Sequence, residues 1–258
     1  MQKLTTGIDI LDSRLNGGVP EGSVISLVAH PMSMGELFLE QLALTRPTLY
    51  FTNSRPSESI VRSVGELDSG TVGEYLEDEE HDESESESES ESEEVLNVVD
   101  LAVDGKSSSS SPSPSSSPSP SSEGTTDTEA DTTRSILDSL EDLDTDEPQN
   151  VVFDSFSEHV RQKQNDYRTV LRRLHEVTHA SSGIACLHIT KGDRSLTRDE
   201  EYVLSVSDVV FYLMIDPDGD KVENRLAVTK IRDGAPPDET IKLDIGQRIS
   251  VETSREIA

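Results

Sequence analysis

The sequence has no tryptophan, one cysteine, five phenylalanines and five tyrosines among its 258 residues. Its single thiol, Cys186, has no partner for an internal disulfide, which predicts a small core residue in a reducing compartment. The longest apolar run, 209–215, is much shorter than the roughly 20 residues that cross a bilayer. No charged-then-apolar leader opens the chain. We therefore expect a soluble, cytoplasmic protein that does not bind a membrane.

Basic residues are scarce too. The chain has 22 basic and 52 acidic side chains, a net charge of −30, and arginine outnumbers lysine by 15 to 7. This balance favours a halophilic protein over one of ordinary acidity. Residues 74–150 hold 25 of the acidic and 2 of the basic side chains, and the rest of the chain is still acidic. Such charge repels a phosphate backbone, which argues against nucleic acid as a partner.

Two low-complexity blocks interrupt a sequence that otherwise resembles one globular domain over 1–258. Residues 77–94 end in "ESESESESESEE", and residues 105–133 contain "SSSSSPSPSSSPSPSSEG". Neither block has enough apolar side chains to offset the entropy of ordering it. Residues 95–102, "VLNVVDLA", lie between the blocks and have the β-branched composition of a buried strand. The sequence therefore predicts two disordered inserts on either side of one buried strand.

Short apolar runs alternate with helical periods along the rest of the chain. The runs that predict buried strands are 23–29, 48–52, 95–102, 150–154, 183–189 and 208–215. The periods that predict helices are 35–45, 56–67, 134–143, 156–180 and 197–205. Near-continuous apolar strands separated by helices indicate an α/β fold, with a mostly parallel sheet covered by helices on both faces. The later segments 224–233 and 240–252 alternate with period two, which predicts antiparallel strands at the C-terminal edge.

The order of several motifs resembles that of the RecA-superfamily ATPases, particularly the KaiC and RadA-like group. The opening "LTTGIDILDSRLNGGVPEGSVISLVA" resembles the start of that group, and "NVVFDS" resembles its Walker B strand. The segments "SDVVFYL", "RLAVTKIRDGAPP" and "IKLDIGQRISV" resemble its last strands in order and spacing. Apart from the two blocks, the resemblance covers almost the whole chain. It implies a RecA-like P-loop NTPase fold.

The stretch "HPMSMGEL" stands where that family has its phosphate-binding loop. A P-loop, G-x-x-x-x-G-K-[ST], needs backbone N–H groups for the phosphates, a lysine for the β/γ-phosphates and a hydroxyl for Mg²⁺. The matching positions here hold His30, Gly35, Glu36 and Leu37, with Ser33 inside the loop. Glutamate in place of lysine replaces an attraction by a repulsion, each of order 4 kcal/mol at ~4 Å and an effective dielectric near 20. We interpret the motif as a degenerate Walker A loop.

Other positions agree with the loss of ATPase chemistry. The resemblance implies an acidic catalytic pair after the second strand, where this chain has Asn53, Ser54 and Arg55. Asp154 and Ser155 match the end of the Walker B strand, either as a residual binding site or as an ordinary polar strand end. We assign no catalytic residue.

Lys230 and Arg232 match a basic pair that, in the family, contacts the nucleotide of a neighbouring subunit. The alternative is an edge strand with ordinary cations.

The segment "HEVTH" fits the H-E-x-x-H pattern of zinc proteases, with His175 and His179 on one helix face. The same face carries Arg168 and Arg172, and no third ligand stands at a suitable spacing. We expect a solvated helix face and no metal.

These features predict a degenerate RecA/KaiC-like domain that acts as a regulatory or scaffolding subunit. Its partners would be proteins, including RecA/KaiC-like paralogues or signalling proteins, in a homo- or hetero-oligomer. No cofactor is expected. The alternative is an ATPase of the KaiC/RadA-like group that binds ATP and Mg²⁺ in signalling or DNA recombination and repair. A DNA-binding recombination accessory protein is a third reading, which the net charge opposes.

Overall fold

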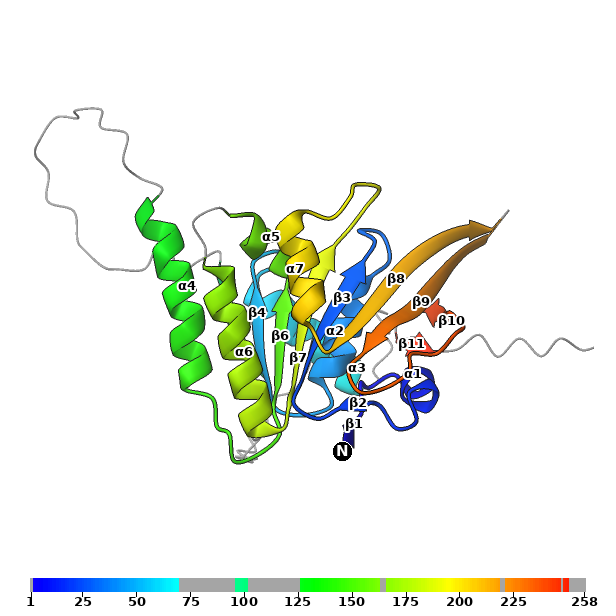
Figure 1. The fold of residues 1–258 in the computed structure, drawn as a ribbon, viewed down its shortest axis with the longest axis horizontal. Coiled ribbons are helices and arrows are strands. Elements are labelled where there is room, and N and C mark those ends of the chain that lie inside the picture. Colours follow the sequence, from blue (N-terminus) through cyan, green and yellow to red (C-terminus); the bar gives the residue numbers. More distant parts are fainter. Residues whose placement is uncertain are drawn as a thin grey trace, which may run out of the picture.

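The computed structural model describes residues 2–69, 96–101, 126–162, 166–218, 221–246 and 248–250. At its centre is a nine-stranded sheet with the strand order β11-β10-β9-β8-β3-β7-β6-β4-β5 (Figure 1). The parallel strands are β3 (Ser23–Ala29), β4 (Thr48–Thr52), β5 (Leu96–Asp100), β6 (Asn150–Asp154), β7 (Ile184–Thr190) and β8 (Val209–Asp218). The antiparallel strands are β9 (Lys221–Ile231), β10 (Ile241–Ile245) and β11 (Ile249–Ser250). A separate two-stranded ribbon pairs β1 (Lys3–Leu4) with β2 (Val19–Pro20).

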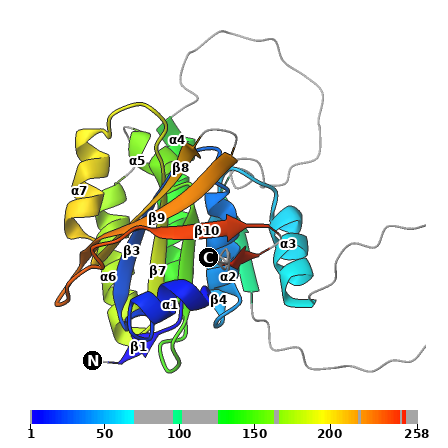
Figure 2. The same ribbon diagram turned by 90° about the vertical axis from the view of Figure 1, so that its right-hand side faces the viewer.

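Helices cover both faces of the sheet (Figures 1 and 2). One hydrophobic cluster joins the sheet to α1 (Asp9–Arg14), α2 (Gly35–Ala43) and α3 (Ser57–Ser69). The other joins it to α4 (Thr126–Glu141), α5 (Phe156–Arg161), α6 (Tyr167–Ser181) and α7 (Arg198–Val206). Strand β3 shows why two clusters form, because Ile25 and Leu27 enter the first and Val24 and Val28 the second. The predicted α/β architecture, with its antiparallel C-terminal edge, is confirmed.

The expectation of one helix over 156–180 is wrong. Helix α5 ends at Arg161, and α6 begins at Tyr167. The carboxylate of Asp166 accepts a hydrogen bond from the backbone N–H of Thr169 at 3.1 Å, which caps the start of α6. The apolar residues of 156–180 keep a helical period throughout, but Asp166 caps the start of a second helix within this segment.

The two low-complexity blocks fall largely outside the described residues. This holds for all of 77–94 and for 105–125. Residues 126–133, which we assigned to the second block, belong to α4, so that helix begins before the expected 134. Residues 126–133 contain no proline, so no residue there is incompatible with a helix.

The strand expected between the blocks exists, but it is not fully buried. Strand β5 pairs with β4 at the end of the described strand order, and four of its five side chains are half-buried, with Asn97 exposed. Its β-branched composition is that of a strand, but composition does not distinguish an edge from a centre.

Cys186 lies fully buried in β7, as expected of a core residue, and burial raises the pKa of its thiol. Within the part of the chain that the structure describes, no helix combines the length and the apolar character that a bilayer crossing requires.

Candidate functional site

The carboxyl ends of the central parallel strands meet at one edge of the sheet. Ala29 of β3 lies beside Thr190 of β7 and Leu213 of β8, and Thr52 of β4 lies beside Asp154 of β6. In open α/β sheets, ligands bind outside this edge. Because the loop 30–34 joins β3 to α2 here, the structure brings the predicted loop residues and Asp154 into one region.

The loop 30–34 uses several of its backbone groups internally. The N–H of His30 donates to the carbonyl of Leu213 at 3.0 Å, and the N–H of Ser33 donates to the carbonyl of His30 at 2.9 Å. The hydroxyl of Ser33 donates to the same carbonyl at 2.6 Å. Met34 caps α2 in a left-handed conformation with φ 52°. The side chains of Met32 and Met34 extend into solvent, with exposed fractions of 73% and 52%.

Gly35 is required by packing. A Cβ atom on Gly35 would lie 2.8 Å from the Cβ of Ala29 and 3.2 Å from Nε2 of His188. The first turn of α2 therefore rests directly on β3 and β7. Glu36 follows in that turn, and Leu37 is buried in the first hydrophobic cluster. A leucine in this position contributes to the core and offers no ligand atom.

Asp154 is buried at the end of β6 and is fully occupied by partners from the chain itself. Its Oδ1 is 3.0 Å from Nδ1 of His188, and its Oδ2 accepts a hydrogen bond from the Ser54 hydroxyl at 3.0 Å. Nη2 of Arg55 lies 3.7 Å from the same Oδ2. Burial alone would raise the pKa of Asp154, but the hydrogen bond with His188 and the charge of Arg55 hold that pKa below its ordinary value. The aspartate is ionised at neutral pH.

Arg55 connects Asp154 to a second buried carboxylate. Its Nη1 is 2.7 Å from Oε1 of Glu40 in α2, and Oε2 of Glu40 accepts from the Ser63 hydroxyl at 2.7 Å. Burial lowers the pKa of Arg55, but Tyr50 and Glu40 outweigh it, so the pKa is raised. We call Glu40, Arg55, Asp154 and His188 the Asp154 cluster. It holds two buried carboxylates and a single guanidinium.

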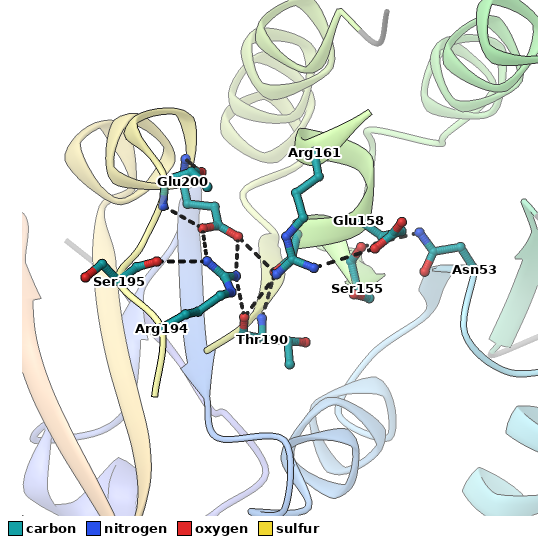
Figure 3. Close-up of polar contacts among 10 residues, drawn as sticks. Asn53, Ser155, Glu158, Arg161, Thr190, Arg194, Ser195 and Glu200 are labelled. Atoms are coloured by element: carbon teal, nitrogen blue, oxygen red, sulfur yellow. Dashed lines mark hydrogen bonds and ion pairs between the residues drawn. The ribbon is translucent and has the colours of Figure 1, made fainter. Parts of the chain in front are cut away.

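A second cluster surrounds the buried carboxylate of Glu200 in α7 (Figure 3). Arg194 binds this carboxylate with both terminal nitrogens, at 2.8 and 2.7 Å, and Nη2 of Arg161 reaches it at 3.3 Å. Both arginines also donate to the carbonyl of Thr190 at the end of β7. Burial tends to raise the pKa of Glu200, but Arg194 and the cap formed with Thr197 lower it from 4.5 to about 2. We call Arg161, Arg194 and Glu200 the Glu200 cluster.

Ser155 has a smaller role between the two clusters. Its carbonyl accepts a hydrogen bond from the Asn53 amide at 3.4 Å (Figure 3). Its N–H donates to Oδ1 of Asp154 at 3.1 Å. Asn53, which stands where the family's acidic pair is expected, therefore joins the ends of β4 and β6.

Lys230 and Arg232 lie at the opposite end of the strands from the loop. Lys230 pairs with Val210 near the start of β8, and its Nζ donates to the carbonyls of Ser205 and Leu204 at 2.7 and 3.2 Å. Nε of Arg232 is 2.8 Å from Oδ1 of Asp208. Both cations stabilise the C-terminal end of α7, where the helix dipole favours positive charge. The structure does not bring them to the loop of the same chain.

His175 and His179 line a cavity of about 460 Å³ near the start of β3, together with Asp208. Nδ1 of His175 is 3.7 Å from Oδ2 of Asp208. Among the residues that the structure describes, no three His, Cys, Asp or Glu side chains gather closely enough to hold a metal ion.

Sequence reasoning named Asp154, and it named Ser54 and Arg55 at the expected position of the acidic pair, but it missed Glu40 and His188. Glu40 and His188 each interrupt an apolar run, in "LFLEQLAL" and "GIACLHI", and a polar residue in such a run signals a buried hydrogen bond. Glu200 had the local signal of a capping box, "TRDE". No spacing in the sequence could show that Arg55, from a loop, lies between the carboxylates.

The sequence profile of a family of unknown function (DUF7125) matches residues 3–109 and 102–258. No curated protein matches the chain. A KaiC-like protein from the hyperthermophilic archaeon Pyrococcus horikoshii OT3 has a similar structure, with a TM-score of 0.63 and 14% identity over 97% of this chain and 98% of that one. At this identity the likeness shows the fold alone: the chain is folded like a KaiC-like protein.

Proposed function

The chain belongs to the family of unknown function DUF7125, whose profile matches nearly all of the sequence, and we propose a function from the residues of the candidate site. The protein is a catalytically degenerate RecA/KaiC-like domain that acts as a regulatory or scaffolding subunit. The observation that carries the proposal is the position of Arg55. Its guanidinium lies 3.7 Å from Asp154, the carboxylate that would orient Mg²⁺ in an active ATPase of this fold. The chain's own cation thus supplies the positive charge that a metal ion would bring.

The loop itself supports the same proposal. Glu36 lies in the first turn of α2, where a helix dipole favours an anion, so its carboxylate competes with a phosphate for that position. Leu37 is packed into the core, where a hydroxyl ligand for Mg²⁺ would be needed. The N–H groups of His30 and Ser33 already donate to carbonyls, and the N–H of Met32 donates to Nδ1 of His30, so these three donors are engaged within the protein.

A domain that does not turn over nucleotide would act through protein contacts. The exposed Met32 and Met34 favour this role, because flexible apolar side chains at a surface adapt to protein partners. RecA/KaiC-like paralogues are one class of partner. Lys230 and Arg232 could then contact a neighbouring subunit, after releasing the end of α7 that they now stabilise.

The alternative is an ATPase with a non-standard loop, in signalling or in DNA recombination and repair. It is favoured by the retained strand–loop–helix connection, with a glycine at the start of α2, and by the fold shared with a KaiC-like protein. Binding of ATP and Mg²⁺ separates the two functions directly.

The test is a calorimetric titration of the protein with ATP and Mg²⁺, in parallel with the double variant Glu36→Lys/Leu37→Thr. We expect no saturable heat and no thermal stabilisation of the unmodified protein at millimolar nucleotide, and weak binding only in the double variant. Glu58→Lys is the matched control for the change of charge, because Glu58 also lies in the first turn of a helix, α3. Micromolar binding by the unmodified protein would refute the proposal, and hydrolysis would then be assayed.

A further inference from the structure

A groove between α6 and α7 has an unusual composition for this chain. The helices lie next to each other on one face of the sheet (Figure 1), and the groove between them has a volume of about 430 Å³. Its walls include Arg168, Arg172 and His175 from α6, and Tyr202 and Val206 from α7. In a chain with a net charge of −30, no carboxylate belongs to this lining.

The arginines of the groove are accessible. The Arg172 side chain is 75% exposed, and that of Arg168 is 58% exposed. Asp199 and Glu176 lie 3.8 Å from Arg168 and Arg172, outside the lining, and each such contact occupies only part of a guanidinium that has five N–H donors. Burial is the main cause that lowers the pKa of His175, so this ring is neutral at pH 7 and the arginines provide the charge.

An aromatic surface accompanies the charge. The guanidinium of Arg168 lies 4.2 Å from the ring centroid of Tyr202 and 5.5 Å from that of Tyr167. Stacking of this kind orders the guanidinium plane. Nε of Arg168 donates to the Tyr167 hydroxyl at 3.1 Å and Nη2 lies near Asp199, which leaves further N–H groups of the two terminal nitrogens for a carboxylate. Tyrosine and arginine are also the residue types that contribute most to protein–protein binding energy.

We propose that the α6–α7 groove is the docking site for an acidic segment of a partner protein, whose carboxylates bind Arg168 and Arg172 and whose apolar side chain contacts Tyr202. This inference deepens the scaffolding function proposed above and rests on it for the role of the contact. Charge complementarity selects the partner, because the groove is a local cationic surface on an acidic protein.

Other polyanions fit less well. A nucleic acid would bring its phosphates over the acidic surface around the groove, whereas a peptide confines its charge to the groove. The chain's own acidic block, 77–94, is attached between α3 and β5. Helix α3 covers the other face of the sheet, and β5 is at the far edge, beyond β7, β6 and β4. The described elements on either side of that block are therefore separated from the groove by the sheet or by α4 and α6, which favours a partner.

The test is fluorescence anisotropy with the full chain and a labelled peptide of alternating glutamate and serine that contains one central phenylalanine. A peptide with glutamine in place of glutamate controls for charge. We expect saturable binding of the acidic peptide, at least tenfold weaker binding by Arg168→Ser/Arg172→Ser, and several-fold weaker binding by Tyr202→Ala. Circular dichroism confirms that each variant is folded.

Arg62→Ser is the matched control for the arginine variants. Arg62 is also 75% exposed and is paired with Glu66 four residues later at 4.0 Å, as Arg172 is with Glu176, but it lies on α3. We expect the affinity of Arg62→Ser for the peptide to stay within twofold of the affinity of the unmodified protein.

Three results would overturn the proposal. Equal affinity of the unmodified protein and the double arginine variant would remove the groove as the site. Tighter binding of a single-stranded oligonucleotide than of the acidic peptide would assign the groove to nucleic acid. A tenfold gain in peptide affinity on deletion of residues 77–94 would identify the chain's own segment as the occupant. None of these measurements involves ATP, so failure here is distinguishable from failure of the degenerate-ATPase proposal.

Discussion

The Asp154 cluster and the Glu200 cluster lie at the same edge of the sheet but have opposite charge balances. In the first, Arg55 serves two buried carboxylates, Asp154 and Glu40. In the second, Arg161 and Arg194 serve one buried carboxylate, and both arginines are more than a third exposed. If Glu200 is removed, water can solvate the partly exposed arginines that it leaves behind. If Arg55 is removed, water cannot readily solvate the two buried carboxylates that it leaves behind. This difference predicts how much each cluster loses when one member is removed.

Arg55→Leu should have the largest effect. It leaves two carboxylates buried without their cation, and breaking a buried pair in this way costs about 3–5 kcal/mol. Urea unfolding at pH 7 measures the change. Arg62→Leu, on the surface of α3, should stay within about 0.5 kcal/mol. A loss below about 1 kcal/mol for Arg55→Leu would mean that water reaches both carboxylates and would end the contrast between the clusters.

Glu200→Gln should cost less, about 1.5–3 kcal/mol, which is the range for hydrogen bonds to charged groups. The arginines left behind are partly exposed and can turn towards solvent, and glutamine can still cap α7 with Thr197. The same urea titration applies, with the exposed neighbour Glu201→Gln as the control. If Glu200→Gln destabilises the protein more than Arg55→Leu, the explanation by solvent access is incorrect.

Gly35→Ala should perturb the Asp154 cluster through His188, and not the Glu200 cluster. The new Cβ would meet Ala29 and His188, and overpacking of this kind costs about 1–3 kcal/mol. Gly65→Ala in α3 is the control, since its Cβ would meet no atom within 4 Å, and it should stabilise the helix by about 0.5–1 kcal/mol. Thermal unfolding compares the two. Similar melting temperatures for both variants would contradict the close contact between α2 and β7.

Acid should reduce the contribution of the Glu200 cluster. The pKa of Glu200 in the folded protein, about 2, lies below its ordinary value of 4.5, so its stabilisation is complete above pH 4.5 and is lost as pH falls towards 2. By pH 4 the loss is about 1 kcal/mol. The difference in unfolding free energy between the unmodified protein and Glu200→Gln should therefore narrow by that amount from pH 7 to pH 4. A constant difference would show that Glu200 titrates normally.

Much of the architecture was predictable because its signals are local. The central strands and α2, α3 and α7 were expected close to their observed bounds, since apolar period reports which side chains face a core. Two expectations failed: Asp166 caps a new helix within 156–180, and β5 lies at an edge of the sheet although its composition resembles that of a buried strand.

The candidate site was predicted only in part. The loop residues and Asp154 follow from motif order, whereas Arg55, Glu40 and His188 come from three further elements whose convergence depends on strand order.

The sequence by itself determined the fold class, the unusual residues of the loop 30–37 and the concentration of acid in the middle of the chain, because period, motif order and composition are properties of neighbouring residues. Only the tertiary structure decided that Arg55 lies between two buried carboxylates and that Arg168, Arg172 and Tyr202 face one groove. The physical reason is that charges interact strongly only over a few ångströms. The order of the strands in the sheet and the packing of α6 and α7 on it decide which charges come that close.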